Sequence, residues 1–383
     1  MTARLLFFQS IGGRRMRRNA TIAACLGIMA LFSACNGGHQ NRFKEQETQQ
    51  AEATINYERF DQVIYDLDNC IHRPAVAGDY DLLKVDIPDE DSLCLQQRIA
   101  QIKEKYPEQF KHYLMMLGEL SSGYDVANET LFYLFLSNEA YHDLYKDCQD
   151  RYQDVSDLNA YFTKAFSRAQ QLIPGYETPQ NIFYIFSGFG DYLSIDENTL
   201  YVSLEYFLGE DYKNYQYVPG IYQYQIKNLK RERMVTDAIY ECTCEHFPLE
   251  VEAGNLLDNL LYFGKMLYIT EAILPQEDAK NIIGFSKDEW EWCEKNEASM
   301  WNYLRENNLL FETDNKVITD FVIMSGSTKY FSTDKYTAPG RAAVWLGWQI
   351  IAQYMERNPN LSLTDLIHEN NSQKILQGSR YNP

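Results

Sequence analysis

The densest group of residues able to bind a metal ion or transfer protons lies between positions 236 and 246. Asp237 and Glu241 are four residues apart, as are Cys242 and His246, so each pair would share one face of a helix. A site built from Asp237, Glu241 and His246 would suit a metal-dependent hydrolase. Neither pair has the His-x-x-x-His spacing of a zinc site, and Pro248 ends the helix. The expected arrangement is therefore two solvated acids beside small buried thiols, with the metal site as the alternative.

Other residues with chemical potential have simpler interpretations. The histidines show no motif that joins one of them to a serine or cysteine nucleophile. The pair Gly188-Phe-Gly190 lacks the third glycine of a dinucleotide loop and predicts a turn. The acidic run 89–91 predicts a solvated loop, and Trp290, Trp292 and Trp301 predict a helix packing face. An exposed aromatic platform for carbohydrate is the alternative for these tryptophans. The residues alone predict neither catalysis nor a cofactor.

The N-terminus has the pattern of an export signal. Arg14, Arg15, Arg17 and Arg18 precede an apolar run at 22–32, which is too short for a permanent membrane span of about 20 residues. Two small residues, Ser33 and Ala34, then precede Cys35, as in the cleavage site of a lipoprotein signal. We expect residues 1–34 to be removed and Cys35 to carry fatty acyl chains such as palmitate. Met16 is an alternative start for the same signal.

The segment after Cys35 is polar and rich in Gln and Glu, so residues 35–54 predict a lipidated, flexible tether before a folded body at 55–383. The whole chain has a net charge of −19, and loss of the five arginines in 1–34 makes the remainder −24. This charge excludes nucleic acid as an expected partner. The expected partners are the membrane, through the lipid anchor, and proteins of the cell envelope. Six cysteines follow Cys35, enough for one or two disulfides in an exported protein.

Periodicity predicts a body that is mainly α with a small antiparallel β-sheet, an α+β class. Residues 181–187 and 199–205 are rich in β-branched and aromatic side chains and flank a turn sequence at 196–198, which predicts the sheet. The predicted helices are 57–69, 93–106, 107–120, 128–137, 138–148, 157–172, 231–246, 253–274, 287–306, 340–357 and 362–370, with helical periodicity starting again at Gln223.

Several ordered motifs resemble the GldB family, the gliding-motility lipoproteins of the Bacteroidota. They are LEYFLGEDY at 204–212 with Tyr215 and Pro219, an apolar helix at 256–268 containing Gly-Lys, Ala-Pro-Gly-Arg at 338–341, Leu-Gly-Trp-Gln-Ile at 346–350, and the terminal segment 378–383. Together they cover most of residues 57–383. The resemblance implies a component of the gliding-motility or associated secretion machinery. Residues after Cys35 lack an acidic run, which favours the periplasmic face of the outer membrane.

The GldB family is in turn similar to predicted zinc-dependent proteases of zincin type, in which a small sheet precedes a helix with the HExxH motif. In that register Asp237 and Glu241 replace the two histidines, and Ala238 replaces the glutamate that acts as general base. The third ligand would fall at Phe263, before Gly264. Alanine and phenylalanine can neither bind zinc nor activate water. The resemblance therefore implies a zincin-like body without zincin catalysis.

Overall fold

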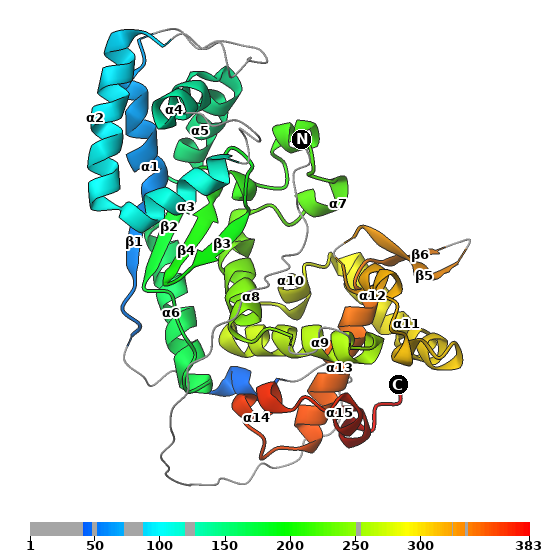
Figure 1. Cartoon of the computed structure of the whole chain (residues 1–383). Coiled ribbons are helices and arrows are strands. Elements are labelled where there is room, and N and C mark those ends of the chain that lie inside the picture. The colour runs from blue at the N-terminus through cyan, green and yellow to red at the C-terminus, as the bar shows by residue number, and fades with distance from the viewer. Residues whose placement is uncertain are drawn as a thin grey trace.

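The computed structural model describes residues 41–47, 52–72, 87–118, 127–249, 254–323, 325–333 and 336–383. Cys35 and the predicted signal lie outside these residues. Figure 1 shows a central sheet with one group of helices above it, around α2, α4 and α5, and a second group below it, around α9 and α13 to α15. Among the described residues, no helix has both the length and the apolar character needed to cross a membrane.

The central sheet has four strands in the order β1-β2-β4-β3. Strands β1 (Asn56–Arg59), β2 (Asn181–Ile185) and β4 (Thr199–Ser203) are parallel, and β3 (Leu193–Asp196) runs antiparallel to β4 at one edge. The prediction of an antiparallel sheet from the two segments at 181 and 199 was therefore wrong. The turn at 196–198 joins β3 to β4, and β4 pairs in parallel with β2. Both strands are buried almost throughout, which is typical of parallel strands covered on both faces.

The first helical group follows the edge strand β1. It contains α1 (Phe60–Tyr65), η2 (Asp66–Cys70), α2 (Asp89–Lys105), α3 (Pro107–Gly118), α4 (Asn128–Ser137) and α5 (Glu139–Arg151), and α6 (Ser156–Leu172) then leads to β2. A disulfide between Cys70 and Cys94 joins η2 to α2, in line with the expectation of one or two bridges. Cys148, Cys242 and Cys293 are buried free thiols.

Two segments of this group differ from the prediction. The segment 57–69 was predicted as one helix, but it begins as strand β1, because its backbone pairs with β2. The acidic run 89–91 was predicted as a loop, but it forms the first turn of α2, where negative charge is favoured by the helix dipole. Asp91 is fully buried there and accepts a hydrogen bond of 2.6 Å from Nδ1 of His72.

The second half of the chain is mostly helical. Its elements are η3 (Leu204–Phe207), η4 (Lys213–Tyr217), α7 (Gln223–Ile226), η5 (Arg231–Arg233), α8 (Met234–His246), α9 (Leu256–Ile273), α10 (Ala279–Ile283), α11 (Lys287–Glu306), η6 (Leu309–Phe311), α12 (Asn315–Val322), the antiparallel hairpin of β5 (Ser327–Thr333) and β6 (Tyr336–Pro339), α13 (Ala342–Arg357), α14 (Leu363–His368) and α15 (Ser372–Ser379).

Helices α9 and α13 form the centre of this half. A Cβ placed on Gly347 would lie 2.0 Å from the carbonyl oxygen of Leu260, and a Cβ on Gly264 would lie 2.5 Å from the carbonyl carbon of Gly347. The two backbones therefore touch at these glycines. Trp290 of α11 packs edge-on against Trp345 and Trp348 of α13.

The tryptophans of α11 pack as the sequence predicted. Trp301 is buried, and Trp290 and Trp292 are partly buried against the core. The tryptophans of α11 are therefore packing residues of the core.

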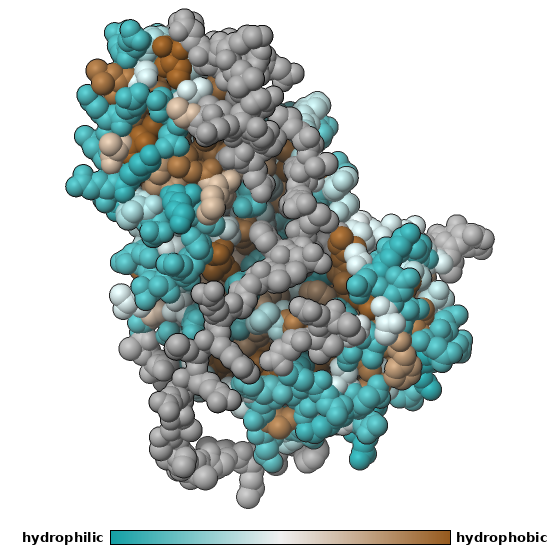
Figure 2. Space-filling view, viewed as in Figure 1, coloured by the Kyte–Doolittle hydropathy of each residue, from teal (hydrophilic) through white to brown (hydrophobic). Residues whose placement is uncertain are grey.

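On the face seen in Figure 2, hydrophilic side chains cover most of the surface over the C-terminal helices, and hydrophobic side chains appear between polar ones at the end formed by α2.

The short helix η1 (Arg42–Glu45) lies against the C-terminal helices. The sequence places residues 41–47 within the tether, whereas here Phe43 is buried in the core beside Tyr268 of α9. The side chain of Asn41 is also buried and donates a 2.9 Å hydrogen bond to the carbonyl oxygen of Tyr268. Ordered packing of the body thus includes residues well before position 55.

Candidate functional site

Helix α8 carries the residues with the strongest chemical signal in the sequence. It contacts β3, α6 and α9, and eight of its residues are buried. Asp237 and Glu241, four residues apart, lie on its one narrow polar face. The helix begins directly after η5 and ends at His246, before Pro248. The predicted pairing of Asp237 and Glu241 on one face is therefore present.

Asp237 has two partners that hold its carboxylate. The guanidinium of Arg233, one turn earlier, forms an ion pair with Oδ1, and the hydroxyl of Tyr192 donates a hydrogen bond to Oδ2. The side chains of Arg233 and Asp237 are only 7% and 13% exposed. Burial raises the pKa of Tyr192 well above its usual value, and the charge of Asp237 raises that pKa further. Asp237 thus connects α8 to Tyr192, the residue just before β3. The prediction that Asp237 is a solvated acid was therefore wrong.

Glu241 experiences a different electrostatic environment. Burial raises the pKa of Glu241 to about 7, and the negative charge of Asp237 adds to the increase. The positive charge of Arg341 acts in the opposite direction. Arg341 is 5% exposed, stands directly before α13, and donates a 3.1 Å hydrogen bond to the hydroxyl of Tyr240.

Arg233, Asp237, Glu241 and Arg341 form what we call the acid–arginine cluster. The guanidinium of Arg233 pairs with the carboxylate of Asp237, and the positive charge of Arg341 acts on Glu241, in a site of low exposure. These guanidiniums supply the positive charge that a divalent metal ion would supply to a pair of acidic ligands. The cluster links α8, η5 and the N-terminus of α13. Its geometry is that of a buried ionic contact between elements.

His246 does not join this cluster. It lies nine residues after Asp237 on α8, so the two side chains leave opposite faces of the helix. The ring of His246 packs against Tyr176 and Phe247, and burial lowers its pKa. The metal site of Asp237, Glu241 and His246 considered from the sequence is therefore not assembled. Cys242 is buried, and burial raises the pKa of its thiol, which disfavours the thiolate that binds metals.

A model of the family described as gliding motility protein GldB matches residues 83–383. The chain belongs to the GldB family. The match contains α8, the acid–arginine cluster and every motif from 204 onward that suggested the family. Neither a curated protein nor a solved structure matches the chain. The family assignment thus identifies a protein related to gliding motility. The similarity to zincins stays a prediction.

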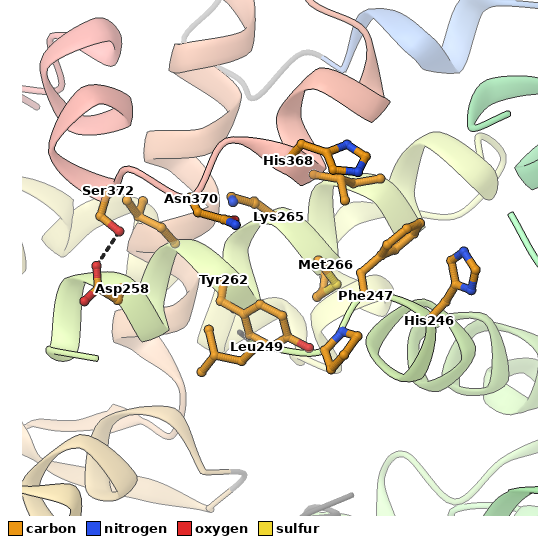
Figure 3. A pocket seen from close by; sticks show the side chains of 13 residues that line it. His246, Phe247, Leu249, Asp258, Tyr262, Lys265, Met266, His368, Asn370 and Ser372 are labelled. Atoms are coloured by element: carbon orange, nitrogen blue, oxygen red, sulfur yellow. Dashed lines mark hydrogen bonds between the residues drawn. The ribbon is translucent and has the colours of Figure 1, made fainter. Parts of the chain in front are cut away.

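A pocket lies on the other side of α8, where this helix ends beside α9 and the α14–α15 connection. It has a volume of about 330 Å³, and its walls include none of the four cluster residues. Figure 3 shows His246 and Phe247 entering from the end of α8, and Lys265 from α9. Lys265 is 7% exposed, and its Nζ donates a 2.6 Å hydrogen bond to the carbonyl oxygen of Glu369. Ser372 donates to Asp258 across one end of the pocket.

Two further features involve acids outside α8. Among the described residues, His72, Glu90 and Asp91 are the group of three whose ligand atoms lie close enough to share a metal ion, and Glu90 is exposed. Glu205 is fully buried and accepts hydrogen bonds from the hydroxyl of Ser187 at 2.5 Å and from the backbone nitrogen of Phe189 at 3.1 Å. Burial raises the pKa of Glu205. Glu205 therefore holds the turn at 188–190 that the sequence predicted.

Sequence reasoning missed Glu205, Arg233, Tyr192 and Arg341 as members of polar sites. The signal for Glu205 was a single charge within an apolar segment, LEYF at 204–207. The signal for Arg233 was its position four residues before Asp237 on a helix. Tyr192 and Arg341 left no such local signal, because they approach α8 from 45 and 101 residues away from their partners.

Proposed function

We propose that this member of the GldB family is a lipoprotein of the cell envelope, acylated on Cys35, that acts without catalysis in the gliding-motility machinery or its associated secretion system. The family match supports the link to gliding. The sequence pattern of 1–35 supports the lipid anchor. We place the protein at the periplasmic face of the outer membrane, where it would bind other envelope proteins.

The acid–arginine cluster is the observation that carries the non-catalytic proposal. In the zincin register inferred from the sequence, α8 would be the helix that follows the small sheet, and Asp237 and Glu241 would take the positions of the zinc-binding histidines. Arg233 pairs with Asp237, Arg341 acts on Glu241 through its charge, and the general-base position of that register would hold Ala238, which is fully buried. Phe263, at the position of the third ligand, packs against Tyr262. A zincin mechanism needs an open metal position and a base beside it, and these side chains provide neither.

The alternative is a metal-binding hydrolase that uses Asp237, Glu241 and His246. The observation in its favour is the pKa of Glu241 near 7, since acid–base catalysts have pKa values close to the working pH. The position of His246 on the opposite face of α8 speaks against it. A metal bound by the two acids alone would have to displace Arg233 from Asp237 and would be repelled by the charge of Arg341.

Metal analysis of the purified body, residues 41–383, separates the two candidates. We expect no stoichiometric zinc in the parent protein after exposure to zinc and dialysis. Zinc that is bound at one equivalent, and lost in Asp237→Ala and Glu241→Ala but retained in Glu232→Ala, would establish the alternative. Glu232 is an exposed acid just before α8 and serves as the matched control.

The anchor and location need separate tests in cells. Metabolic labelling with an alkyne analogue of palmitate should label the parent protein and not Cys35→Ala, which should also leave the membrane fraction. Protease added to intact cells should spare the protein if it faces the periplasm. Cross-linking followed by purification from membranes would then identify the envelope proteins that it contacts.

A further inference from the structure

The first described residues after the predicted anchor are built into the body. Asn41 is 5% exposed, and its Nδ2 donates to the carbonyl oxygen of Tyr268 at 2.9 Å and to Oε2 of Glu271 at 3.1 Å. Phe43 is 7% exposed and meets the ring of Tyr268 edge-on. Lys44 Nζ donates to the carbonyl oxygen of Glu277 at 3.1 Å. The segment is therefore held in place from Asn41 to Lys44.

Hydrogen bonds of Arg168 and Arg42 connect the same segment to α6, α9 and α13. Arg168 of α6 is 3% exposed and donates to the carbonyl oxygen of Ala272 in α9 at 2.7 Å. It also donates to the carbonyl oxygens of Phe43, Lys44 and Gln46. From within the segment, Arg42 donates to the carbonyl oxygens of Met355, near the end of α13, and Leu361, just before α14. Hydrogen bonds from a buried guanidinium to backbone carbonyls fix both partners, because losing one leaves a buried charged donor unsatisfied.

The path from this fixed point to Cys35 is short. Asn41 is six positions after Cys35, and six steps of fully extended chain reach about 20 Å. A lipid on Cys35 would therefore keep Asn41 within about 20 Å of the bilayer. This reach is smaller than a compact body of this length, which is about 50 Å across. In Figure 1, α2, α4 and α5 lie at the opposite end of the body from η1.

We propose that the surface around Asn41, the end of α13 at Met355 and the connection 358–362 faces the lipid bilayer; this surface is the anchor face. The proposal rests on the proposed acylation of Cys35. The anchored protein then has a fixed orientation, with the disulfide-linked end at α2 pointing away from the membrane and open to other envelope proteins. The anchor face contacts the lipid surface, because the chain between Cys35 and Asn41 is too short for the body to turn this face away from the bilayer.

The test uses the full-length acylated protein in vesicles of phosphatidylethanolamine and phosphatidylglycerol that contain a nitroxide-labelled headgroup. One fluorophore is placed at Asn360→Cys, exposed on the anchor face, and another at Gln97→Cys, exposed on α2. Labelling of the parent protein measures the background from Cys244, the half-buried free thiol. We expect severalfold stronger quenching at position 360 than at position 97.

A linker variant shows whether the short chain causes the difference. About 30 Gly and Ser residues inserted between Gln40 and Asn41 add a flexible chain with an end-to-end distance of about 30 Å. The insertion leaves the packed segment unchanged, and quenching at the two positions should become similar. Unequal quenching that survives the insertion would mean that another contact orients the body, and this result would overturn the proposal.

Flotation of the vesicles distinguishes a failure of the proposed anchor from a failure of the proposed orientation. Parent protein that fails to float with vesicles, or floats as well when it carries Cys35→Ala, would refute the proposed anchor. Parent protein that floats through Cys35 and shows equal quenching at 360 and 97 would refute the orientation and leave the anchor intact.

Discussion

Glu241 is the group in the acid–arginine cluster whose protonation changes near neutral pH. Its pKa is raised from 4.5 to about 7, mainly by burial. The folded state therefore holds this proton more tightly than the unfolded state does. The stabilisation from protonated Glu241 is fully present below pH 4.5 and is lost as the pH rises through about 7. Above pH 7 the carboxylate stays charged in a site that hydrates it poorly.

We predict that Glu241→Gln flattens this part of the stability profile. Glutamine keeps the shape of the protonated acid and does not titrate. Between pH 5 and pH 8 the wild type should lose on the order of 2–3 kcal/mol of unfolding free energy that the variant retains. Urea unfolding of residues 41–383 at several pH values measures this difference. Glu232→Gln at an exposed site is the control and should follow the wild type, and a parallel profile for Glu241→Gln would contradict the pKa shift.

Arg233 and Asp237 allow a sharper test of the ionic contact. Arg233→Met leaves the carboxylate of Asp237 poorly exposed and without its ion pair, and should lower the free energy of unfolding by about 3–5 kcal/mol. Asp237→Leu in the same protein removes that unpaired charge. The double variant should therefore recover much of the loss, as a buried ion pair contributes little net stability. Additive losses in the two single variants and the double variant would show that the pair is not coupled.

At the scale of elements, the backbone contact between α9 and α13 depends on two glycines. We predict that Gly347→Ala lowers the free energy of unfolding by about 3 kcal/mol or more, because the added methyl would overlap the Leu260 carbonyl and separate the helices. Gly190→Ala is the control, since its Cβ would lie 3.4 Å from Ser187, an ordinary contact. Thermal unfolding of both variants checks this, and equal midpoints would show that α13 can shift without cost.

Helices with complete apolar periodicity could be predicted closely from the sequence. Residues 128–137 and 287–306 form α4 and α11 with the predicted bounds. The segment 57–69 was harder, because its apolar spacing fits a helix while β1 depends on pairing with β2, more than a hundred residues later. Strand direction had the same difficulty. The spacing of 181–185 and 199–203 indicates strands, but their parallel pairing depends on β3, which the turn at 196–198 joins to β4.

The candidate site shows the same limit. Spacing on a helix put Asp237 and Glu241 on one face, and the same spacing with the wrong partner suggested His246. The charge balance at these acids needs Arg341 from the start of α13, and local sequence carries no record of that approach. Polar composition likewise predicted a tether at 35–54, while the order of residues 41–47 comes from Arg168, over 120 residues away.

At the scale of the whole molecule, residues 41–47 connect the N-terminal part of the body to its C-terminal helices through Arg168 and Arg42. Packing of Phe43 contributes about 2–3 kcal/mol, and the hydrogen bonds of the segment contribute about 1 kcal/mol each. Ordering seven residues costs about 1–2 kcal/mol for each residue. These contributions nearly cancel, so the segment should add only a small net stability, on the order of 2 kcal/mol.

We therefore predict that a body starting at residue 55 unfolds at lower temperature than one starting at residue 41. Phe43→Ala in the longer body should reproduce most of the loss, because the cavity left by the ring weakens docking of the whole segment. Arg42→Ala should have a smaller effect, since Arg42 is only partly buried. Calorimetry of the two bodies and the two variants checks the order. Identical midpoints for the two bodies would mean that the segment docks without net stabilisation, and a lipid anchor would then swing on a chain as long as the full predicted tether.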